Sequence, residues 1–278
     1  ENMEWKRLRR KFAKNPLNLI SVVVFALFLA MAFFPQIFTQ FEPNRMNSAV
    51  RMISPTASHI FGTDQFGRDI YSRVVHGVRE TLSIAFLSIV LACVLGTALG
   101  VISGFYGRWI DQIVMRLMDA MFAFPTIILA LFIIALYGAS QKNLIIALGI
   151  VYTPIFTRTV RGSTISIKQF LYIKAAKALG KRDLSIMLKD VLPNLTSVLI
   201  VSFTTNFSTA VLSEASLSFL GLGVPPPTPT LGGMVGQGSN FLLSAPWIAL
   251  FPGLFIALIV LSINIIGDGL RDVLDPRY

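Results

Sequence analysis

Glu214 is the only acidic residue well inside an apolar stretch of this chain, the stretch from residue 195 to residue 219. A charged side chain at the centre of a bilayer costs about 2.5–3.5 kcal/mol on insertion scales, so this carboxyl should face protein or a water-filled cavity. One interpretation places it on a substrate path with its neighbours Ser213 and Phe219, where it could meet an ammonium group or another cation. The other makes it a protonated or hydrogen-bonded packing residue near the outer end of a span, and we favour packing.

Residue types that usually carry catalysis or hold cofactors are scarce. Cys93, the only cysteine, lies in an apolar run, and His59 and His76 are the only histidines, so neither a disulfide framework nor a metal site is expected. The only Gly-Lys pair begins at Gly180 and is not followed by Ser or Thr, as a phosphate-binding loop requires. We therefore expect no ATPase site, no other enzymatic site and no resident cofactor in this chain.

The composition is that of a membrane protein. Of 278 residues, 54% are hydrophobic and only 14% are charged, an apolar excess too large for a soluble domain of this length. The net charge of +10 is dispersed among apolar stretches, without the aromatic and basic face that binds nucleic acid. The sequence therefore predicts an all-α polytopic protein in a lipid bilayer, with no nucleic-acid partner.

Six apolar stretches are candidates for transmembrane helices, each needing about 20 residues. They cover about residues 17–38, 81–105, 120–139, 144–156, 195–219 and 247–266, and flanking residues must lengthen the fourth. The first stretch also fits a signal peptide with Ala30-Met31-Ala32 as its cleavage site, but the apolar run continues to Phe38, so we reject that alternative. Pro125 lies near the start of the third stretch, where proline is tolerated or causes a kink.

Two connections and one helix face have a distinct character. Residues 39–80 combine turn formers with alternating charge, which is typical of a compact extramembrane segment. Residues 221–245 carry no charge and contain three consecutive prolines, so they cannot continue a helix and fit a re-entrant or gate-forming loop. Gly96, Gly100 and Gly104 share one face of the second span, where small residues allow another helix to approach closely.

The segment from residue 158 to residue 193 is the longest charged stretch. Its basic residues are Arg158, Arg161, Lys168, Lys174, Lys177, Lys181, Arg182 and Lys189. Spans on both sides make it a loop on one face of the membrane. One helix is predicted from an apolar repeat and a separate basic face; the apolar repeat is Leu171, Ala175, Ala178 and Leu179.

Gly180 should end this helix, as glycine does just past a helix terminus. Asp183 can cap a second helix, and Pro193 should end it. The apolar face of the second helix is predicted to be Leu184, Met187, Leu188, Val191 and Leu192. The expected result is a helix–turn–helix at the membrane surface.

Lysine and arginine are distributed unequally between the two sides of the predicted membrane. Six spans place both termini on one side, together with residues 158–193. That side has 18 basic residues and the other has 6. Because basic residues are enriched in cytoplasmic segments, both termini and this loop should be cytoplasmic.

Lys174-Ala175-Ala176, followed by Gly180 and Leu192-Pro193, resembles the cytoplasmic EAA loop of ABC-importer permease subunits. The resemblance implies that the loop couples transport to ATP hydrolysis by docking into a groove on an ATP-binding partner. Two positions depart from the pattern, because Lys174 replaces the usual Glu and Asp190 stands where an aliphatic residue is common. The alternative is a basic amphipathic loop on anionic lipid headgroups.

Three further motifs resemble permeases of the dipeptide/oligopeptide/nickel importer group. They are Gly67-Arg68-Asp69, the run from Ser216 to Pro227, and Gly267 to Asp272 with Asp275-Pro276. Together with the loop they extend over essentially the whole chain, and they identify it as the second-permease (C-type) subunit of that group. A self-sufficient secondary transporter is the rival hypothesis, but such carriers usually show intramembrane ionisable relays and more spans.

The resemblance implies a type I permease fold and transport of short peptides by alternating access, with nickel chelates or glutathione-like solutes as the alternative. It also implies a second homologous permease, two ATP-binding subunits that hold ATP and magnesium, and an extracytoplasmic solute-binding protein. The location would be a bacterial or archaeal cytoplasmic membrane. The expected division is residues 1–78 for the tail, first span and outer segment, 79–268 for the permease core, and 269–278 for a cytoplasmic tail.

Overall fold

The computed structural model describes residue 12 and residues 15–274. The basic side chains of residues 6–11 and Lys14, and the Asp275-Pro276 pair, lie outside the described residues. Within the described part, the secondary structure is helical apart from one isolated bridge between Thr63 and Asp69, so the predicted all-α fold class is confirmed. Five helices there are long and apolar enough to cross a membrane, and a bent helix pair makes a sixth span if it is counted as one.

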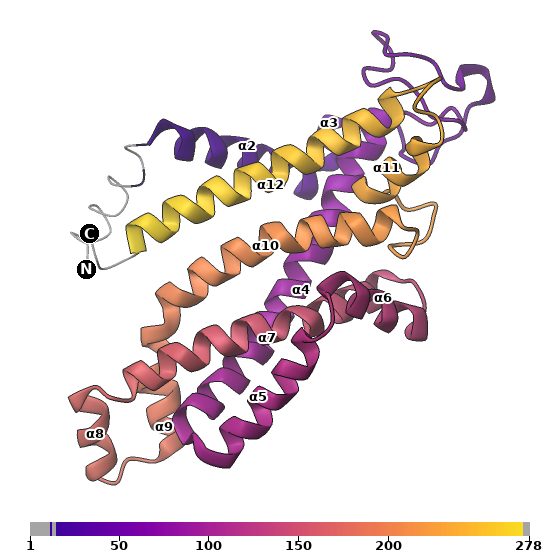
Figure 1. Cartoon of the computed structure of the whole chain (residues 1–278). Coiled ribbons are helices and arrows are strands. Elements are labelled where there is room, and N and C mark those ends of the chain that lie inside the picture. Colours follow the sequence, from indigo (N-terminus) through magenta and orange to yellow (C-terminus); the bar gives the residue numbers. More distant parts are fainter. Residues whose placement is uncertain (1–11, 13–14, 275–278) are drawn as a thin grey trace.

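Helix α4 (Ile70–Tyr106) runs through the bundle and contacts α7, α10 and α2 (Figure 1). It begins at Ile70 rather than at the predicted residue 81, because Asp69 caps it by accepting a hydrogen bond from the Ser72 backbone N–H at 2.8 Å. It ends at Gly107, whose φ of 67° ordinary side chains rarely adopt. Residues 70–80 therefore belong to this helix and not to an outer loop.

The first and third predicted spans are interrupted by proline. The first consists of α2 (Pro16–Phe33) and the short α3 (Pro35–Phe38). The third is bent at Pro125, where a kink was one of the two predicted outcomes: α5 (Arg108–Phe122) and α6 (Thr126–Tyr137) meet at 90°. Pro125 disfavours helical geometry in the residue before it, so the chain turns there. Residues 108–119, predicted to be a simple link, instead form most of α5.

Helix α7 (Gln141–Ile167) continues through ten residues assigned to the loop from the sequence. Arg158 and Arg161 do not end this helix, because each of them pairs with an acidic residue on α5. Arg158 pairs with Asp119, and Arg161 pairs through two nitrogens with Asp111. An amphipathic helix beside α7 thus lets the span carry two arginines.

The face of small residues on α4 lies against α7. A Cβ atom added to Gly96 would sit 2.4 Å from the Phe156 Cβ, and one added to Gly100 would sit 2.7 Å from the Thr157 carbonyl oxygen. At Gly104 the nearest atom would be the Thr164 Cβ, at 2.8 Å. These distances exclude side chains at all three positions, so α4 and α7 are packed backbone to backbone.

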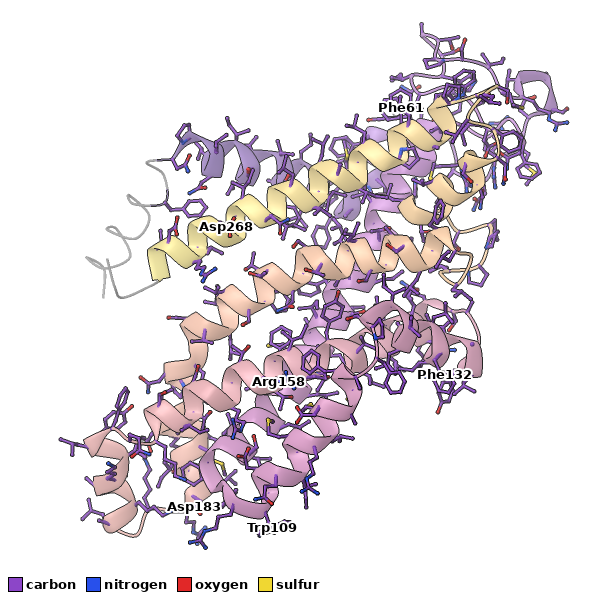
Figure 2. All side chains as sticks on the ribbon, in the orientation of Figure 1. Phe61, Trp109, Phe132, Arg158, Asp183 and Asp268 are labelled. Atoms are coloured by element: carbon purple, nitrogen blue, oxygen red, sulfur yellow. The ribbon has the colours of Figure 1, made fainter. Side chains whose placement is uncertain are left out.

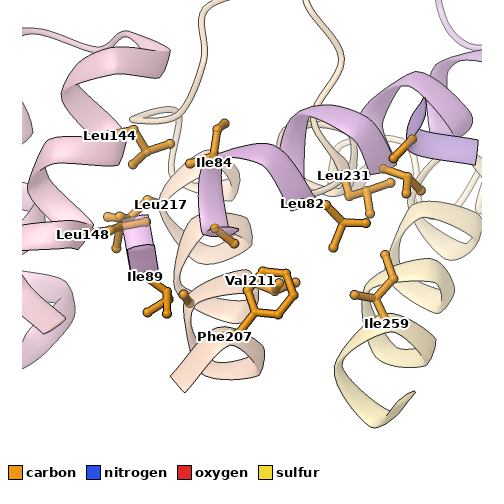
Figure 3. Packing of buried hydrophobic residues seen from close by; sticks show 14 of the residues in the cluster. Leu82, Ile84, Ile89, Leu144, Leu148, Phe207, Val211, Leu217, Leu231 and Ile259 are labelled. Carbon is orange, nitrogen blue, oxygen red and sulfur yellow. The ribbon is translucent and has the colours of Figure 1, made fainter. Parts of the chain in front are cut away.

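The main core joins these two helices to α10 (Thr196–Phe219), α11 (Leu231–Ser239) and α12 (Trp247–Leu274). Figure 3 shows side chains of α4, α7, α10 and α12 meeting in it, with Ile84, Leu148, Val211 and Ile259 among those buried. Helix α11 lies within residues 221–245, so that segment is not loop throughout. The chain resumes helical structure at Leu231, beyond its prolines.

Residues 39–69 form a cap at one end of the bundle, with a single short helix, η1 (Ser48–Val50) (Figure 1). Asp64 organises it. Its side chain accepts hydrogen bonds from the Phe66 and Arg68 backbone N–H groups at 2.8 and 3.0 Å, and from Arg68 Nε at 2.6 Å. Arg73 from α4 approaches the same carboxylate at 3.9 Å. All three charged side chains are buried, so the ion pairs of the cap lie away from solvent.

Aromatic side chains join the cap to α12. The Phe61 ring stacks on Phe251 at a centroid distance of 4.0 Å, and the Trp247 indole donates a hydrogen bond to the Thr63 carbonyl at 3.2 Å. Gly67 has φ 69° and provides the turn that brings Arg68 back to Asp64. The Gly67-Arg68-Asp69 motif therefore has a structural role, as turn, ion-pair partner and helix cap.

Candidate functional site

Helices α8 (Leu171–Ala178) and α9 (Asp183–Ile186) form a hairpin, residues 171–186, at the end of the bundle opposite to the cap (Figure 1). Figure 2 shows Asp183 and Trp109 at this end and Phe61 at the other. The end of α8 is a Schellman motif, in which Lys181 N–H bonds to the Ala176 carbonyl and Gly180 N–H to the Lys177 carbonyl, both at 3.1 Å. Gly180 has φ 77°, so the first helix of the hairpin ends at the glycine that the sequence predicted.

A second, smaller hydrophobic core holds the hairpin to the ends of α4 and α7. From the hairpin and the turns after it come Ile173, Ile186, Met187, Val191 and Leu195, all buried. From α4 and α7 come Val101, Phe105, Val160 and Ile167. Movement of the hairpin should therefore reach the two helices that are packed backbone to backbone.

The opposite side of the hairpin is apolar and uncovered. Leu171 is 84% exposed and Leu179 87%, while Leu184 and Leu188 are 63% and 54% exposed. The predicted apolar faces are thus divided. The repeat of Leu171, Ala175, Ala178 and Leu179 faces outward, and Ile173 anchors α8 instead. Exposed leucines on a folded hairpin are typical of a surface that another protein covers.

Basic side chains lie beneath and beside this surface. Lys168 donates a hydrogen bond to the Phe105 carbonyl, and Lys177 lies over the Phe105 ring, 5.6 Å from its centroid. Burial, reinforced by the Lys177 ammonium group, lowers the pKa of Lys168. Lys181 pairs with Asp190, one of the two residues that depart from the EAA-loop pattern.

Two predictions about the second helix are wrong. Asp183 is the first residue of α9 and makes no capping hydrogen bond; the position before the helix belongs to Arg182. Pro193 does not end the helical path, which continues as a π turn, η2 (Met187–Val191), and a tight turn, η3 (Leu192–Leu195), into α10. Proline is tolerated there because it stands in the first turn of η3, where its missing N–H costs least.

The three residues assigned to a substrate path lie in different surroundings. Ser213 is buried, with its hydroxyl 2.9 Å from the Tyr152 hydroxyl. Glu214 is fully buried and accepts a 2.7 Å hydrogen bond from Ser218, while its Oε2 has no partner among the described residues. Phe219 is half-exposed and lines two cavities, of about 230 and 430 Å³, whose linings do not include Ser213 or Glu214.

Sequence reasoning missed two groups of charged residues. Asp111 and Asp119 on α5 hold the arginines of α7, and the repeat of apolar residues along α5, Trp109, Ile113 and Leu117, could have indicated that helix. Arg73 lines the smaller cavity although it belongs to the cap network. No pattern near Arg73 in the sequence points to that cavity.

Comparison with known proteins gives a consistent result. Residues 96–278 match the family described as "Binding-protein-dependent transport system inner membrane component", and residues 4–55 match the "N-terminal TM domain of oligopeptide transport permease C". The dipeptide transport system permease protein DppC of Alkalihalophilus pseudofirmus is 44% identical over 98% of this chain and 90% of its own length. The glutathione transport system permease protein GsiD of Pectobacterium atrosepticum is 37% identical over 98% and 91%.

A solved structure shares the fold. It shows inward-facing conformations of the MetNI methionine ABC transporter, with a TM-score of 0.60, 22% identity, and coverage of 73% of this chain and 96% of that chain. The predicted resemblance is confirmed by these matches, which extend over both the N-terminal and the core segments. The chain therefore belongs to the binding-protein-dependent transport system inner membrane components, the permease subunits of ABC importers.

Proposed function

We propose that this permease imports short peptides and that the α8–α9 hairpin receives the force of ATP hydrolysis from an ATP-binding subunit. The coupling role rests on one observation: the hairpin has one face anchored to the bundle and another face exposed. Ile173 and Ile186 anchor one face to α4 and α7, and Leu171 and Leu179 leave the other face apolar and uncovered. A partner that grips the leucines would move the spans through the anchored face.

The substrate class rests on the relatives. Proteins named for dipeptide and for glutathione transport both align with nearly the whole chain, and glutathione is itself a small peptide. Short peptides are therefore the proposed solutes, with glutathione-like solutes or nickel chelates as the alternative.

The proposed assembly contains this chain, a second homologous permease, two ATP-binding subunits and an extracytoplasmic solute-binding protein. ATP and magnesium would be held by the ATP-binding subunits, and this chain would hydrolyse no ATP on its own. In the cytoplasmic membrane of a bacterium or archaeon, the hairpin and both termini would face the cytoplasm and the cap would face outward. Contact between Gly269 near the end of α12 and Asn18 at the start of α2 supports termini on one side.

Alternating access is the proposed mechanism. Closure of the ATP-binding subunits would draw the hairpins of the two permeases together. The close α4–α7 packing at Gly96, Gly100 and Gly104 would transmit this motion as a rigid unit. We assign Glu214 a packing role, supported by its full burial; transport that changes in Glu214→Gln while assembly is intact would contradict this assignment.

Two neighbouring alanines test the coupling surface. Ala175 is exposed, whereas Ala176 packs against the second core. Ala175→Glu should leave the chain folded and paired with the second permease but weaken co-purification of the ATP-binding subunits. Ala176→Glu should also loosen the hairpin, measured as faster proteolysis at this loop. Ala49→Glu, in the cap, is the control.

Normal uptake and normal co-purification in both hairpin variants would show that the loop only rests on lipid.

Orientation is tested separately, in a variant that lacks Cys93. Cysteines at Ser140 and Ser239 should react with an impermeant reagent in intact cells, and one at Ser185 only after permeabilisation. Labelling of Ser185 in sealed cells would reverse the proposed topology.

A further inference from the structure

The cavity of about 230 Å³ lies at the outer end of α10, between the start of α4, the loop that follows α10, and α11. Its polar lining side chains are Arg73, Ser218, Thr228, Thr230, Gln237 and Asn240. Arg73 is the only charged residue in the lining, and the loop and α11 supply no acid because residues 221–245 carry no charge. A cavity with one buried cation and otherwise neutral polar walls favours an anion.

Arg73 has donors to spare. Its side chain is 2% exposed, and its Nη1 donates to the Pro43 carbonyl and to Asn44 Oδ1, both at 3.0 Å. Its Nε lies 3.9 Å from Asp64, which is already bonded to Arg68. No described residue accepts a hydrogen bond from Nη2, and a guanidinium carries five N–H donors in all. These contacts fix the guanidinium in place and leave its Nη2 group available.

The buried acid Glu214 does not line the cavity, and the Ser218 hydroxyl at the cavity wall donates its hydrogen to Glu214 Oε1. Ser218 therefore presents oxygen lone pairs, not the carboxylate itself. Gln237 on α11 and Asn240 just after it also line the cavity, and each carries an amide group with N–H donors.

We propose that this cavity binds the carboxylate of the transported solute, the C-terminal carboxylate in the case of a short peptide. The proposal rests on peptide import as the proposed function. Hydrogen bonds from a guanidinium to a carboxylate are charge-assisted and stronger than neutral ones, so the free Nη2 group of Arg73 is suited to this end group. At about 230 Å³ the cavity is smaller than the roughly 300–1,000 Å³ of pockets that enclose whole small ligands, so it fits one end of a peptide.

The test compares a dipeptide with its C-terminal amide in proteoliposomes that contain the complete transporter. The binding protein is saturated with either compound, so that its own preference cancels, and initial uptake rates are measured. The wild type should favour the carboxylate form by about tenfold, the effect of hydrogen bonds to a charged group. Arg73→Gln should abolish this preference, and Gln237→Leu should reduce it by about twofold to fivefold.

Arg68→Gln is the matched control, because Arg68 is also buried and paired with Asp64 but does not line the cavity. It should retain the preference even where it lowers stability. Equal preferences for the carboxylate form in Arg68→Gln and Arg73→Gln would mean that Arg73 only stabilises the cap, and would overturn the proposal. The proposal would also be overturned if Arg73→Gln kept the wild-type preference but docked the binding protein more weakly. Arg73 would then bind an acidic residue of that protein.

A wild-type preference of one would overturn the carboxylate site while leaving peptide import intact. Absence of any peptide uptake by the wild type would instead contradict the proposed function. If Arg73→Gln fails to assemble, Gln237→Leu decides: its side chain has similar size and it makes none of the cap contacts. Full retention of the preference in Gln237→Leu would then count against the site.

Discussion

The cap and the hairpin occupy opposite ends of the same bundle and differ in which side chains they bury. In the cap and at the adjoining start of α4, Asp64, Arg68 and Arg73 are almost completely buried, and both oxygens of Asp64 accept hydrogen bonds from within the chain. In the hairpin, Leu171 and Leu179 are almost completely exposed, and the turn at Gly180 has open space around it. The cap end buries charged side chains, and the hairpin end exposes apolar ones.

This difference separates the two ends by what their side chains depend on. Buried charges destabilise a protein strongly when one partner is removed, so folding of the cap depends on its internal ion pairs. Apolar surface is stabilised by removal from water, so the exposed leucines suit the hairpin to contact with a partner. Substitutions should therefore affect folding at the cap and assembly at the hairpin.

Asp64→Ala should have the largest effect. It would leave Arg68 and Arg73 buried without their carboxylate, which destabilises a protein by about 3–5 kcal/mol. The thermal unfolding midpoint of the purified chain in detergent should fall clearly. Glu42→Ala removes an exposed carboxylate from the same segment and should change stability by less than about 0.5 kcal/mol. Equal effects of the two variants would mean that the cap does not depend on its buried ion pairs.

Leu179→Asp should show the reverse behaviour. The side chain is 87% exposed, so the unfolding midpoint of the isolated chain should not change. Binding of the ATP-binding subunit should weaken by about 2 kcal/mol, roughly thirtyfold, as for a central interface residue. Leu243→Asp, at a fully exposed leucine near the cap end, is the control and should leave that affinity as it is. Unaltered binding by Leu179→Asp would remove the hairpin from the coupling interface.

Two glycines with similar φ provide a direct comparison between the ends. A Cβ at Gly67 would lie 1.8 Å from the Asn47 carbonyl oxygen, whereas one at Gly180 would meet nothing within 4 Å. Gly180→Ala should therefore cost only the backbone strain, about 1–2 kcal/mol, and Gly67→Ala more. Gly180→Val should in addition misplace α9 and reduce uptake per ATP hydrolysed. Equal unfolding midpoints for the two alanine variants would contradict this ranking.

Asp190→Asn should have the smallest effect. It breaks the ion pair with Lys181, in which both side chains are partly exposed, so the loss should stay below about 1 kcal/mol and shrink further in high salt. Unfolding of the wild type and the variant is compared at low and high ionic strength. A loss as large as that of Asp64→Ala would show that the hairpin, like the cap, depends on internal charge pairing.

Much of this protein is determined by local sequence. The apolar stretches predict the spans because a bilayer leaves few alternatives to a helix of about 20 apolar residues. Gly180 predicts the hairpin turn because a positive φ strongly favours glycine. The spacing of Gly96, Gly100 and Gly104 predicts a closely packed face, since residues four apart share one side of a helix. In each case the physical cause acts between neighbours in the chain.

Tertiary structure decided the rest, because the deciding partners are distant in sequence. Helix α7 continues past Arg158 since Asp119, 39 residues away, neutralises it, and Arg161 meets Asp111 across 50 residues. Which leucines of the hairpin are covered depends on where α4 and α7 end, so the apolar repeat alone did not determine which face is buried. Arg73 reaches a cavity only because the loop after residue 220 folds back over the start of α4. A local pattern identifies which groups need a partner, and the fold determines which partner each one meets.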